Sequence, residues 1–337
     1  MCYFNRVKQL SIHALVCLST FLASALGQEP STRASSQPAG SLGTIDVYLI
    51  GGQSNATGQG YLANLPVGFT IDERVSLFHS GRPHLDSGAK ALSWMALRQA
   101  SESPDRFGPE LGFGNRLQEQ FRHRKIALIK HAHSGTNLYL QWNPGADAAD
   151  AAHFGPQFKI FVDTVDAGMM GLRNLGYEPM IRGMIWQQGE NDADARATAA
   201  GADIAYGKNL AHFIARVREQ LGAPEMVFVY GYVMPPPNVG EGRDRVRLGE
   251  KNVDQDSGSP LAVRGAFVVP TDDLSQRADD PNTRYPKDHL HFGTAGILEL
   301  GKRMADVMKA YVQIILATFP SSLKDVNDPV PTFDDPS

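Results

Sequence analysis

Cysteine is almost absent from this chain of 337 residues. Its two cysteines, Cys2 and Cys17, both lie in an N-terminal segment that has the features of an export signal. Once that segment is removed, the chain has no thiol, which excludes disulfide bonds, thiolate metal sites and a cysteine nucleophile. Covalent catalysis by the mature protein would therefore have to use another side chain.

An excess of positive charge is also missing. The chain has 32 Lys and Arg residues against 36 Asp and Glu residues, which gives a formal net charge of -4 at pH 7. Proteins that bind nucleic acid carry a basic patch or stripe, so we expect no nucleic-acid partner. With 42% hydrophobic and 20% charged residues, the composition is that of an ordinary globular protein with a large core.

The N-terminal segment lacks the uninterrupted apolar run of a membrane anchor. Arg6 and Lys8 precede a stretch from Leu10 to Leu26 that is apolar but diluted by Ser, Thr and His, and it ends in the small-residue run 23–27. A basic start, a short apolar run and a small-residue end are typical of a secretory signal peptide. We therefore expect cleavage of residues 1–27, a secreted or periplasmic protein, and no stable membrane association. An uncleaved anchor is the alternative.

Composition divides the rest of the chain into three parts. Residues 28–44 are rich in Ser, Pro, Gly and Ala without periodicity, and they predict a flexible linker. The Pro- and Asp-rich residues 320–337 predict a loose tail. We expect residues 45–319 to form one domain, because we find no internal repeat in them and no reason to divide them.

The most informative stretch runs from Ile45 to Asn55 and reads IDVYLIGGQSN. Its β-branched and aromatic residues predict a buried strand, and its two glycines allow a tight turn that presents Ser54 at the end of a sheet. An ordinary polar turn is the alternative, because Gly, Asn and Ser are common in turns. A serine after a strand is therefore a weak sign of catalysis on its own.

Strands and helices alternate along the predicted domain. Besides the strand from Ile45, strands are predicted at 125–132, 181–186, 226–233 and 265–269. Helices are predicted at 109–121, 156–175, 204–221 and 294–318, with a short helix within 240–257. The residues between the Ser54 turn and Arg106 are expected to form long loops with short extended pieces. This order predicts an α/β fold with a five-stranded parallel sheet and helices on both faces.

The expected ligand site of such a sheet lies beyond the carboxyl ends of its strands. The polar groups that should meet there are Ser54, Gly135, Gln188 with Glu190, and Asp288 with His291. Each has an ordinary structural explanation as a turn residue, a solvated strand end or a helix cap. Acyl transfer, however, needs these residue types together: a hydroxyl nucleophile, an imidazole base, a carboxylate and donors for the oxyanion.

Asp288 and His291 have a spacing that suits a catalytic pair. On one local segment, the carboxylate can hold one imidazole nitrogen while the other nitrogen faces Ser54. A serine hydroxyl is a poor nucleophile until a base takes its proton, and a neutral histidine with a pKa of about 6.5 suits that role at neutral pH. We therefore predict Ser54 as nucleophile, His291 as base and Asp288 as the carboxylate that orients it.

Four short motifs together resemble a known family. They are Gly52-Gln53-Ser54-Asn55, Gly-Pro-Glu at 108–110, Trp186-x-Gln188-Gly189-Glu190-x-Asp192 and Asp288-x-x-His291-Phe292. In this order they are similar to the sialate O-acetylesterase and acetyl xylan esterase family of the SGNH hydrolase superfamily. The resemblance runs from about Ile45 to the last helix. It implies a flavodoxin-like three-layer α/β/α fold and serine esterase chemistry on acetylated sugars, with no metal and no cofactor.

The resemblance implies the same three catalytic roles and adds an oxyanion hole. Its expected donors are the backbone amides of Ser54 and Gly135 and the side chain of Gln188, where many other SGNH enzymes use Asn. The family usually has Gly-Gly-Thr after the second strand, whereas this chain has Ser134-Gly135-Thr136, and a serine there does not block an amide. Three further residues are expected to support the site: Gln53, Asn55 and Glu190.

Two other classes of protein stay open from the residues alone. A metal-dependent hydrolase would use His131-x-His133 and His289-x-His291 with Asp288, Glu190 and Asp192. None of the usual helical zinc spacings is present, however, and Ser54 would have no role. A non-catalytic carbohydrate-binding protein would stack sugar rings on Trp94, Trp142, Trp186 and Tyr139, although core tryptophans look the same in a sequence.

The expected partner is an acetylated oligo- or polysaccharide. The sequence does not predict which glycan is bound, because that choice depends on loops at about 61–106 and 235–284. It does not predict an oligomeric state either.

Overall fold

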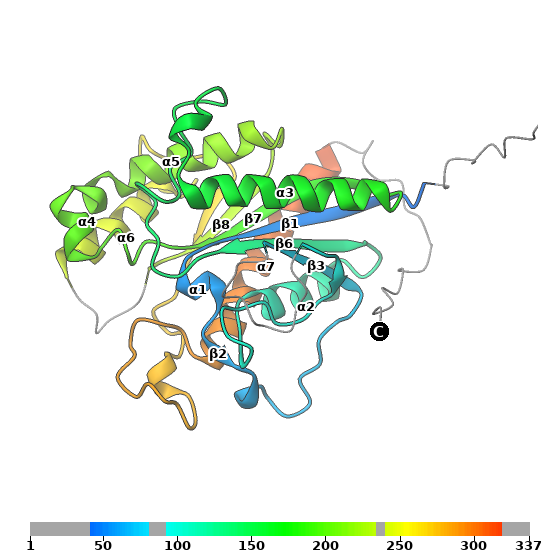
Figure 1. Cartoon of the computed structure of the whole chain (residues 1–337), viewed down its shortest axis with the longest axis horizontal. Helices are drawn as coiled ribbons and strands as arrows, with labels where there is room; N and C mark the ends of the chain where they lie inside the picture. The colour runs from blue at the N-terminus through cyan, green and yellow to red at the C-terminus, as the bar shows by residue number, and fades with distance from the viewer. Residues whose placement is uncertain (1–40, 81–91, 234–239, 319–337) are drawn as a thin grey trace, which may run out of the picture. The chain divides into compact units, whose positions relative to one another are not determined.

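A sheet of seven strands lies at the centre of the computed structural model, with helices on both of its faces (Figure 1). The structure describes residues 41–80, 92–233 and 240–318, all within a unit that starts at Gly40. The predicted signal peptide at 1–27, the linker at 28–44 except residues 41–44, and the tail at 320–337 lie outside the described residues.

The main sheet has the strand order β4-β3-β6-β1-β7-β8-β9. Its strands are β1 (Thr44–Gly52), β3 (Val75–His79), β4 (Met95–Ala96), β6 (Ile126–Ala132), β7 (Glu178–Gln187), β8 (Val227–Gly231) and β9 (Ala266–Val269). All neighbours are parallel except β4, which pairs antiparallel with β3. A separate antiparallel ladder joins β2 (Gly60–Tyr61) to β5 (Arg106–Phe107).

The α/β prediction with a mostly parallel sheet is confirmed, and the five predicted strands are present as β1, β6, β7, β8 and β9. The expected total of five strands is wrong, because β3 and β4 extend one edge of the sheet. Both lie in the region that was expected to form long loops with short extended pieces. β3 contains Ser76 and His79, so it lacks the unbroken apolar run that marks β8 in the sequence.

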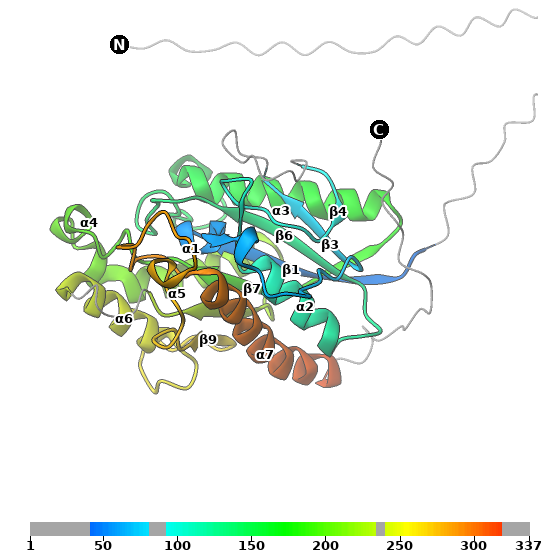
Figure 2. The same ribbon diagram turned by 90° about the horizontal axis from the view of Figure 1, so that it is seen from below.

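The helices form two layers. One layer contains α3 (Pro156–Asn174), α5 (Ala202–Gln220) and α6 (Glu241–Val253), and the other contains α2 (Glu110–Gln120) and α7 (Thr294–Thr318). These helices confirm the five predicted ones. In Figure 1, α3 lies along one face of the sheet and α2 along the other, and Figure 2 shows α2 beside α7.

The remaining helices are short and were not predicted. They are α1 (Ser54–Thr57), α4 (Ala195–Ala199) and three 3-10 turns, η1 (Leu62–Asn64), η2 (Ala151–His153) and η3 (Arg277–Asp279). In the described parts of the chain, no helix has both the length and the apolar character needed to cross a membrane.

β1 separates two hydrophobic cores. Val47 and Leu49 pack in the core under α3 and α5, whereas Tyr48 and Ile50 pack in the core under α2 and α7. Successive side chains of a strand point to opposite faces, so an uninterrupted apolar run is what a strand covered on both faces requires. All four side chains are completely buried. The run therefore holds β1 rigidly in the middle of the sheet.

The connections around β1 diverge. After β1 the chain forms β3, on one side of β1 and beyond β6. After β6 the chain crosses β1 and forms β7 on the other side. Such a reversal of direction opens a crevice at the carboxyl ends of the strands, which is the usual ligand site of parallel sheets. The turn that carries Ser54 follows β1 at that point.

Candidate active site

Ser54 lies where β1 ends and the single-turn helix α1 begins. Gly52 makes this turn possible. Its φ of 134° favours glycine, and a Cβ atom there would lie only 2.1 Å from the carbonyl oxygen of Gln187. The predicted position of Ser54, at the end of the first strand and at the sheet edge, is confirmed.

Asp288 and His291 lie on the loop that leads into α7. The Nε2 atom of His291 is 3.0 Å from the Oγ atom of Ser54. Its Nδ1 atom is 2.9 Å from Oδ2 and 3.0 Å from Oδ1 of Asp288. The backbone N–H groups of Leu290 and His291 also donate to Oδ1 of Asp288, which ties the carboxylate to its own loop. The structure therefore joins the three predicted residues by hydrogen bonds.

Arg277 stands behind Asp288 and was not predicted. It is 4% exposed, its Nη1 atom is 3.3 Å from Oδ2 of Asp288, and its guanidinium group lies 3.7 Å from the ring centroid of Tyr285. Burial alone would raise the pKa of Asp288, but the hydrogen bond and charge of His291, with Arg277, lower it to about 2. Asp288 is therefore ionised at neutral pH and able to orient the imidazole.

Three donors border the space in front of Ser54. The backbone N–H groups of Ser54 and Gly135 have no acceptor among the described residues. The third donor is the side-chain amide of Gln53. Its Oε1 atom accepts hydrogen bonds from Gln188 Nε2 and from the N–H groups of Gly189 and Asn191. These three donors define which end of the amide is oxygen, and they leave Nε2 without an acceptor in the described part of the chain.

Gln188 does not face this space, which departs from the expected oxyanion donor. It is 1% exposed, and its Nε2 atom donates to Gln53 Oε1, to Thr136 O and, at 2.6 Å, to Asp192 Oδ2. An amide nitrogen has only two hydrogens, so none is left for a ligand. Gln53, expected only to support the site, lines the pocket and has an amide nitrogen without an acceptor among the described residues. The sequence could have suggested it, because it directly precedes Ser54.

Glu190 lies beside the site but makes no hydrogen bond to Ser54 or His291 among the described contacts. Its Oε1 atom accepts a 2.7 Å hydrogen bond from Asn55 Nδ2, and burial raises its pKa. Burial also raises the pKa of Asp192, to about 7, although Leu138, Gln188 and Tyr139 donate hydrogen bonds to its carboxylate. Two carboxyl groups are thus held in a poorly solvated region behind the nucleophile.

One pocket of about 550 Å³ connects these groups. It is lined by Gln53, Ser54, Gln59, Ser134, Gly135, Glu190, Asn191, Ala193, Asp194, Leu290 and His291. The lining comes from the turns after β1, β6 and β7 and from the loop before α7, the four segments that the sequence predicted to meet.

The histidines of the metal alternative have separate partners. His131 Nε2 is 3.0 Å from Gln157 Oε1, and His133 Nδ1 is 3.3 Å from Glu102 Oε1. Within residues 41–80, 92–233 and 240–318, no group of three or more His, Cys, Asp or Glu side chains is placed to hold a metal ion. The geometry gives the metal-dependent hydrolase no support.

The aromatic residues of the binding-protein alternative lie mostly inside the protein. Trp142 is 0% and Trp186 is 1% exposed, and their ring centroids are 4.9 Å apart. Trp94 is partly buried and donates from Nε1 to the carbonyl oxygen of Gly168. Trp142 and Trp186 are core residues and present no face to an external sugar.

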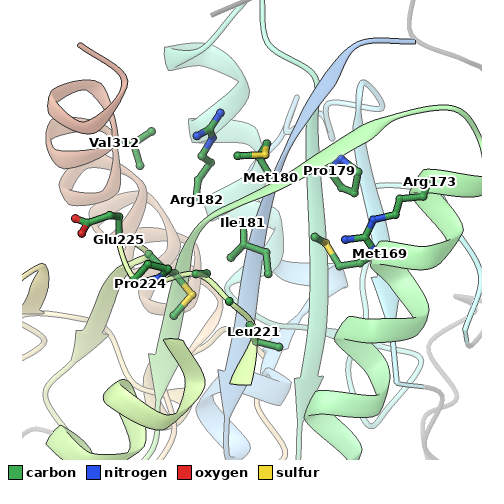
Figure 3. Close-up of a pocket in the computed structure, with 13 residues that line it drawn as sticks. Met169, Arg173, Pro179, Met180, Ile181, Arg182, Leu221, Pro224, Glu225 and Val312 are labelled. Atoms are coloured by element: carbon green, nitrogen blue, oxygen red, sulfur yellow. The ribbon is translucent and has the colours of Figure 1, made fainter. Parts of the chain in front are cut away.

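A second pocket, of about 310 Å³, lies at the amino end of β7, the opposite edge of the sheet. Figure 3 shows Met180, Ile181 and Arg182 along the strand, with Val312 from α7. Arg182 is 8% exposed and donates from Nε to Asp46 Oδ1 at 2.7 Å. None of the predicted site residues lines this pocket.

A parallel sheet that carries a hydrogen-bonded Ser–His–Asp set beyond its carboxyl edge is typical of α/β serine hydrolases. Residues 44–310 match the family model described as carbohydrate esterase, sialic acid-specific acetylesterase, and the chain therefore belongs to this family. It is a carbohydrate esterase, a carboxylic ester hydrolase, with the fold of SGNH hydrolases.

Three solved structures illustrate the shared fold. NanS is 14% identical with a TM-score of 0.57, over 82% of this chain and 98% of its own. A protein from Arabidopsis thaliana is 18% identical with a TM-score of 0.55, over 79% and 98%. A carbohydrate acetylesterase from Xanthomonas citri is 16% identical with a TM-score of 0.50, over 80% and 56%. No curated protein sequence matches the chain.

Proposed function

We propose that the protein removes O-acetyl groups from acetylated glycans through an acetyl-enzyme formed on Ser54. The observation that carries this proposal is the hydrogen-bonded series from Ser54 Oγ through His291 to Asp288, at the border of the 550 Å³ pocket. Membership in a carbohydrate esterase family supports an ester of a sugar as the substrate.

The reaction has two steps. Ser54 Oγ attacks the acetyl carbonyl carbon while His291 Nε2 takes the hydroxyl proton. His291 then gives that proton to the sugar oxygen, which leaves as an alcohol. A water molecule, deprotonated by His291, attacks the acetyl-serine, and proton return to Ser54 releases acetic acid. Asp288 holds the imidazole by Nδ1 and stabilises its positive charge during both steps.

The oxyanion of each tetrahedral intermediate would be held by the N–H groups of Ser54 and Gly135 and by Nε2 of Gln53. Support comes from the absence of other acceptors for these donors among the described residues. Preorganised donors of this kind contribute about 2.7–4 kcal/mol each to transition-state stabilisation. In this proposal Gln188 acts only indirectly, by holding the oxygen of the Gln53 amide.

The acyl group is expected to be small. The pocket is bordered by the turns after β1, β6 and β7, and its lining includes amides, hydroxyls and carboxylates, among them Gln59, Ser134, Asn191 and Asp194, that can hydrogen-bond a polar alcohol. We therefore expect acetate esters of polar alcohols to be cleaved faster than butyrate or longer esters of the same leaving group. A clear preference for long chains would contradict this part of the proposal.

Export is a further part of the proposal, because acetylated polysaccharides are extracellular polymers. The basic and apolar segment at 1–27 supports it. Expression of the full chain in a secreting host, followed by mass measurement of the released protein, tests both export and cleavage near residue 27. Retention of the segment on a cell-bound protein would contradict it.

The decisive experiment is acetate release from acetylated polysaccharides and O-acetyl sialosides by the wild-type protein and by Ser54→Ala. The wild type should release acetate, and the variant should not. Brief incubation with substrate followed by acid quenching should show the mass of one acetyl group on the peptide that contains Ser54. Equal turnover by both proteins would exclude Ser54 as the nucleophile.

A further inference from the structure

Asn55, the residue after Ser54, has a side-chain amide that is fully hydrogen-bonded inside the protein. It is 0% exposed. Its Nδ2 atom donates to Glu190 Oε1 at 2.7 Å and to the carbonyl oxygen of Leu290 at 3.2 Å. Its Oδ1 atom accepts from the N–H group of Phe292 at 3.0 Å. Both amide hydrogens and the amide oxygen are therefore engaged.

Two of these bonds hold His291 from both sides. The carbonyl of Leu290 belongs to the peptide group before His291, and the N–H of Phe292 belongs to the peptide group after it. One side chain next to Ser54 thus holds both peptide groups that flank the imidazole-bearing residue. The separation between Ser54 and His291 is therefore fixed by the two hydrogen bonds of Asn55 as well as by the hydrogen bond between Ser54 and His291.

Glu190 determines which way the Asn55 amide points. An asparagine amide can be rotated to exchange its oxygen and nitrogen, and the Phe292 N–H needs the oxygen. The acceptor Oε1 of Glu190 requires an N–H on the other side, so only one orientation satisfies all partners. The Oε2 atom of Glu190 is shielded from solvent and has no hydrogen-bond partner among the described residues, so Asn55 is the one side chain there that Glu190 holds by a hydrogen bond.

We infer that Glu190 is a positioning residue, which acts through Asn55 to keep His291 at hydrogen-bonding distance from Ser54. The inference rests on the proposed function of the same site. It predicts that loss of Glu190 lowers kcat and leaves KM nearly unchanged, since the base is misplaced while the substrate pocket is intact. The rival is direct contact with the leaving sugar, because Glu190 borders the pocket, and that role would raise KM.

The main test is a double-mutant cycle on Glu190 and Asn55. Asn55→Ala should lower kcat about 100-fold and Glu190→Ala about 10- to 100-fold, because a small displacement of a catalytic group is enough for such a loss. Glu190→Gln keeps an amide oxygen as the acceptor and should stay within about threefold of the wild type. The double alanine variant should lose no more than Asn55→Ala alone, because Glu190 acts only through Asn55.

Multiplied losses in the double variant would overturn the inference. So would equal losses in Glu190→Gln and Glu190→Ala with a raised KM. The matched controls are Glu178→Gln and Glu178→Ala. Glu178 is an exposed glutamate at the amino end of β7, the strand that leads to Glu190. Both controls should retain the wild-type kcat and KM.

A charge exchange covers the case in which an alanine variant fails to fold. Asn55→Asp places a carboxylate against Glu190 and against the Leu290 carbonyl oxygen, so it should lose activity. Asn55→Asp combined with Glu190→Gln restores the donor–acceptor pair between residues 55 and 190 but not the bond to Leu290, so its kcat should be about tenfold above that of Asn55→Asp and below that of the wild type. No recovery in the combined variant would count against the inference.

The rate at which a fluorophosphonate modifies Ser54, measured by intact mass, separates this inference from the proposed function. That rate reports the nucleophile and its base without any sugar ester. It should fall in Glu190→Ala and Asn55→Ala as kcat does, and an unchanged rate would overturn the positioning role. If the wild type reacts with the probe but releases no acetate from any glycan, the proposed function fails and the positioning role is still decided by the variants.

Discussion

Each of the two edges of the sheet has a pocket beside buried charged groups. The edges differ in whether hydrogen-bond donors at the pocket lack an acceptor within the protein. At the amino edge, Arg182 and Arg124 both bind the carboxylate of Asp46, and the unpaired Nη2 of Arg182 is shielded from solvent. At the carboxyl edge, the amide of Gln53 and the N–H of Gly135 have no acceptor among the described residues.

This difference separates a structural cluster from a reactive one. The charges of Asp46, Arg124 and Arg182 compensate one another inside the fold, and the unpaired nitrogen of Arg182 is shielded from solvent, so this cluster holds elements together. Hydrogen-bond donors that lack an acceptor at the border of a pocket destabilise the fold unless a ligand binds there. Such donors therefore indicate where a negatively charged oxygen of a substrate would bind. The presence of a pocket alone does not distinguish the two edges.

The largest expected effect is loss of activity at the carboxyl edge. Ser54→Ala should reduce kcat by about 10⁴-fold or more, because no other hydroxyl stands within hydrogen-bonding distance of His291 Nε2 in the described structure. Steady-state acetate release measures this, with circular dichroism to confirm that the variant is folded. Residual activity above about one tenth of the wild type would remove Ser54 from the mechanism.

The second prediction distinguishes the two glutamines at this edge. Gln53→Leu should lower kcat roughly 10²- to 10³-fold with little change in KM, because one oxyanion donor is lost. Gln188→Leu removes a donor to Gln53 Oε1 and to Asp192, so it should lower thermal stability along with activity. Kinetics combined with melting curves tests the pair. A wild-type kcat in a folded Gln53→Leu protein would show that Gln53 is not an oxyanion donor.

The third prediction concerns the amino edge. Arg182→Met takes one of two partners from the buried Asp46 carboxylate and should cost about 2 kcal/mol of unfolding free energy without changing kcat. Urea unfolding and steady-state kinetics give both values. Arg264→Met, which removes an exposed ion pair with Glu225, is the control and should cost less than about 0.5 kcal/mol. A loss of kcat in folded Arg182→Met would show that the two edges are coupled.

The fourth prediction is a pH dependence of stability from the carboxyl edge. The pKa of Asp192 is about 7 in the fold and about 3.9 in an unfolded chain. Between these values the folded protein keeps a proton that the unfolded chain releases. The contribution is therefore present below pH 4 and lost as pH rises through 7, by at most about 1.4 kcal/mol per pH unit.

Urea unfolding at pH 5 and pH 7 tests this contribution. The wild type should be less stable at pH 7, and Asp192→Asn should reduce the difference. Glu190 and Glu250, whose pKa values burial also raises, act in the same direction and remain in the variant. An undiminished pH difference in Asp192→Asn would assign the effect to those two residues.

Most of the fold was predictable because its signals are local. The run from Val47 to Ile50 is apolar at every position, as a strand covered on both faces must be, and the helical segments have apolar residues at helical spacing. β3 and β4 were expected only as short extended pieces, because Ser76 and His79 interrupt the apolar run of β3 and β4 has two residues. β3 pairs with β6, which is distant in sequence, and β4 pairs with β3, so tertiary pairing decides their place in the sheet.

Within the site, the residue types were predictable and their hydrogen bonds were not. Ser54, Asp288 and His291 were expected to meet, since carboxyl ends of parallel strands share one edge, and their observed distances agree with that expectation. Arg277 was missed because an arginine in a loop has no pattern of its own. Two of the tryptophans proposed for sugar stacking, Trp142 and Trp186, lie in the core, which composition cannot reveal.

The sequence by itself determined the alternation of strands and helices. It also determined which polar residues follow the strands at the carboxyl edge of the sheet: Gln53, Ser54, Gly135, Gln188, Asp288 and His291. Tertiary structure decided which glutamine keeps its amide for the pocket and which residue holds His291 in place. The physical reason is that an amide orients according to its partners, and those of Gln53 and Asn55 lie more than one hundred residues away along the chain.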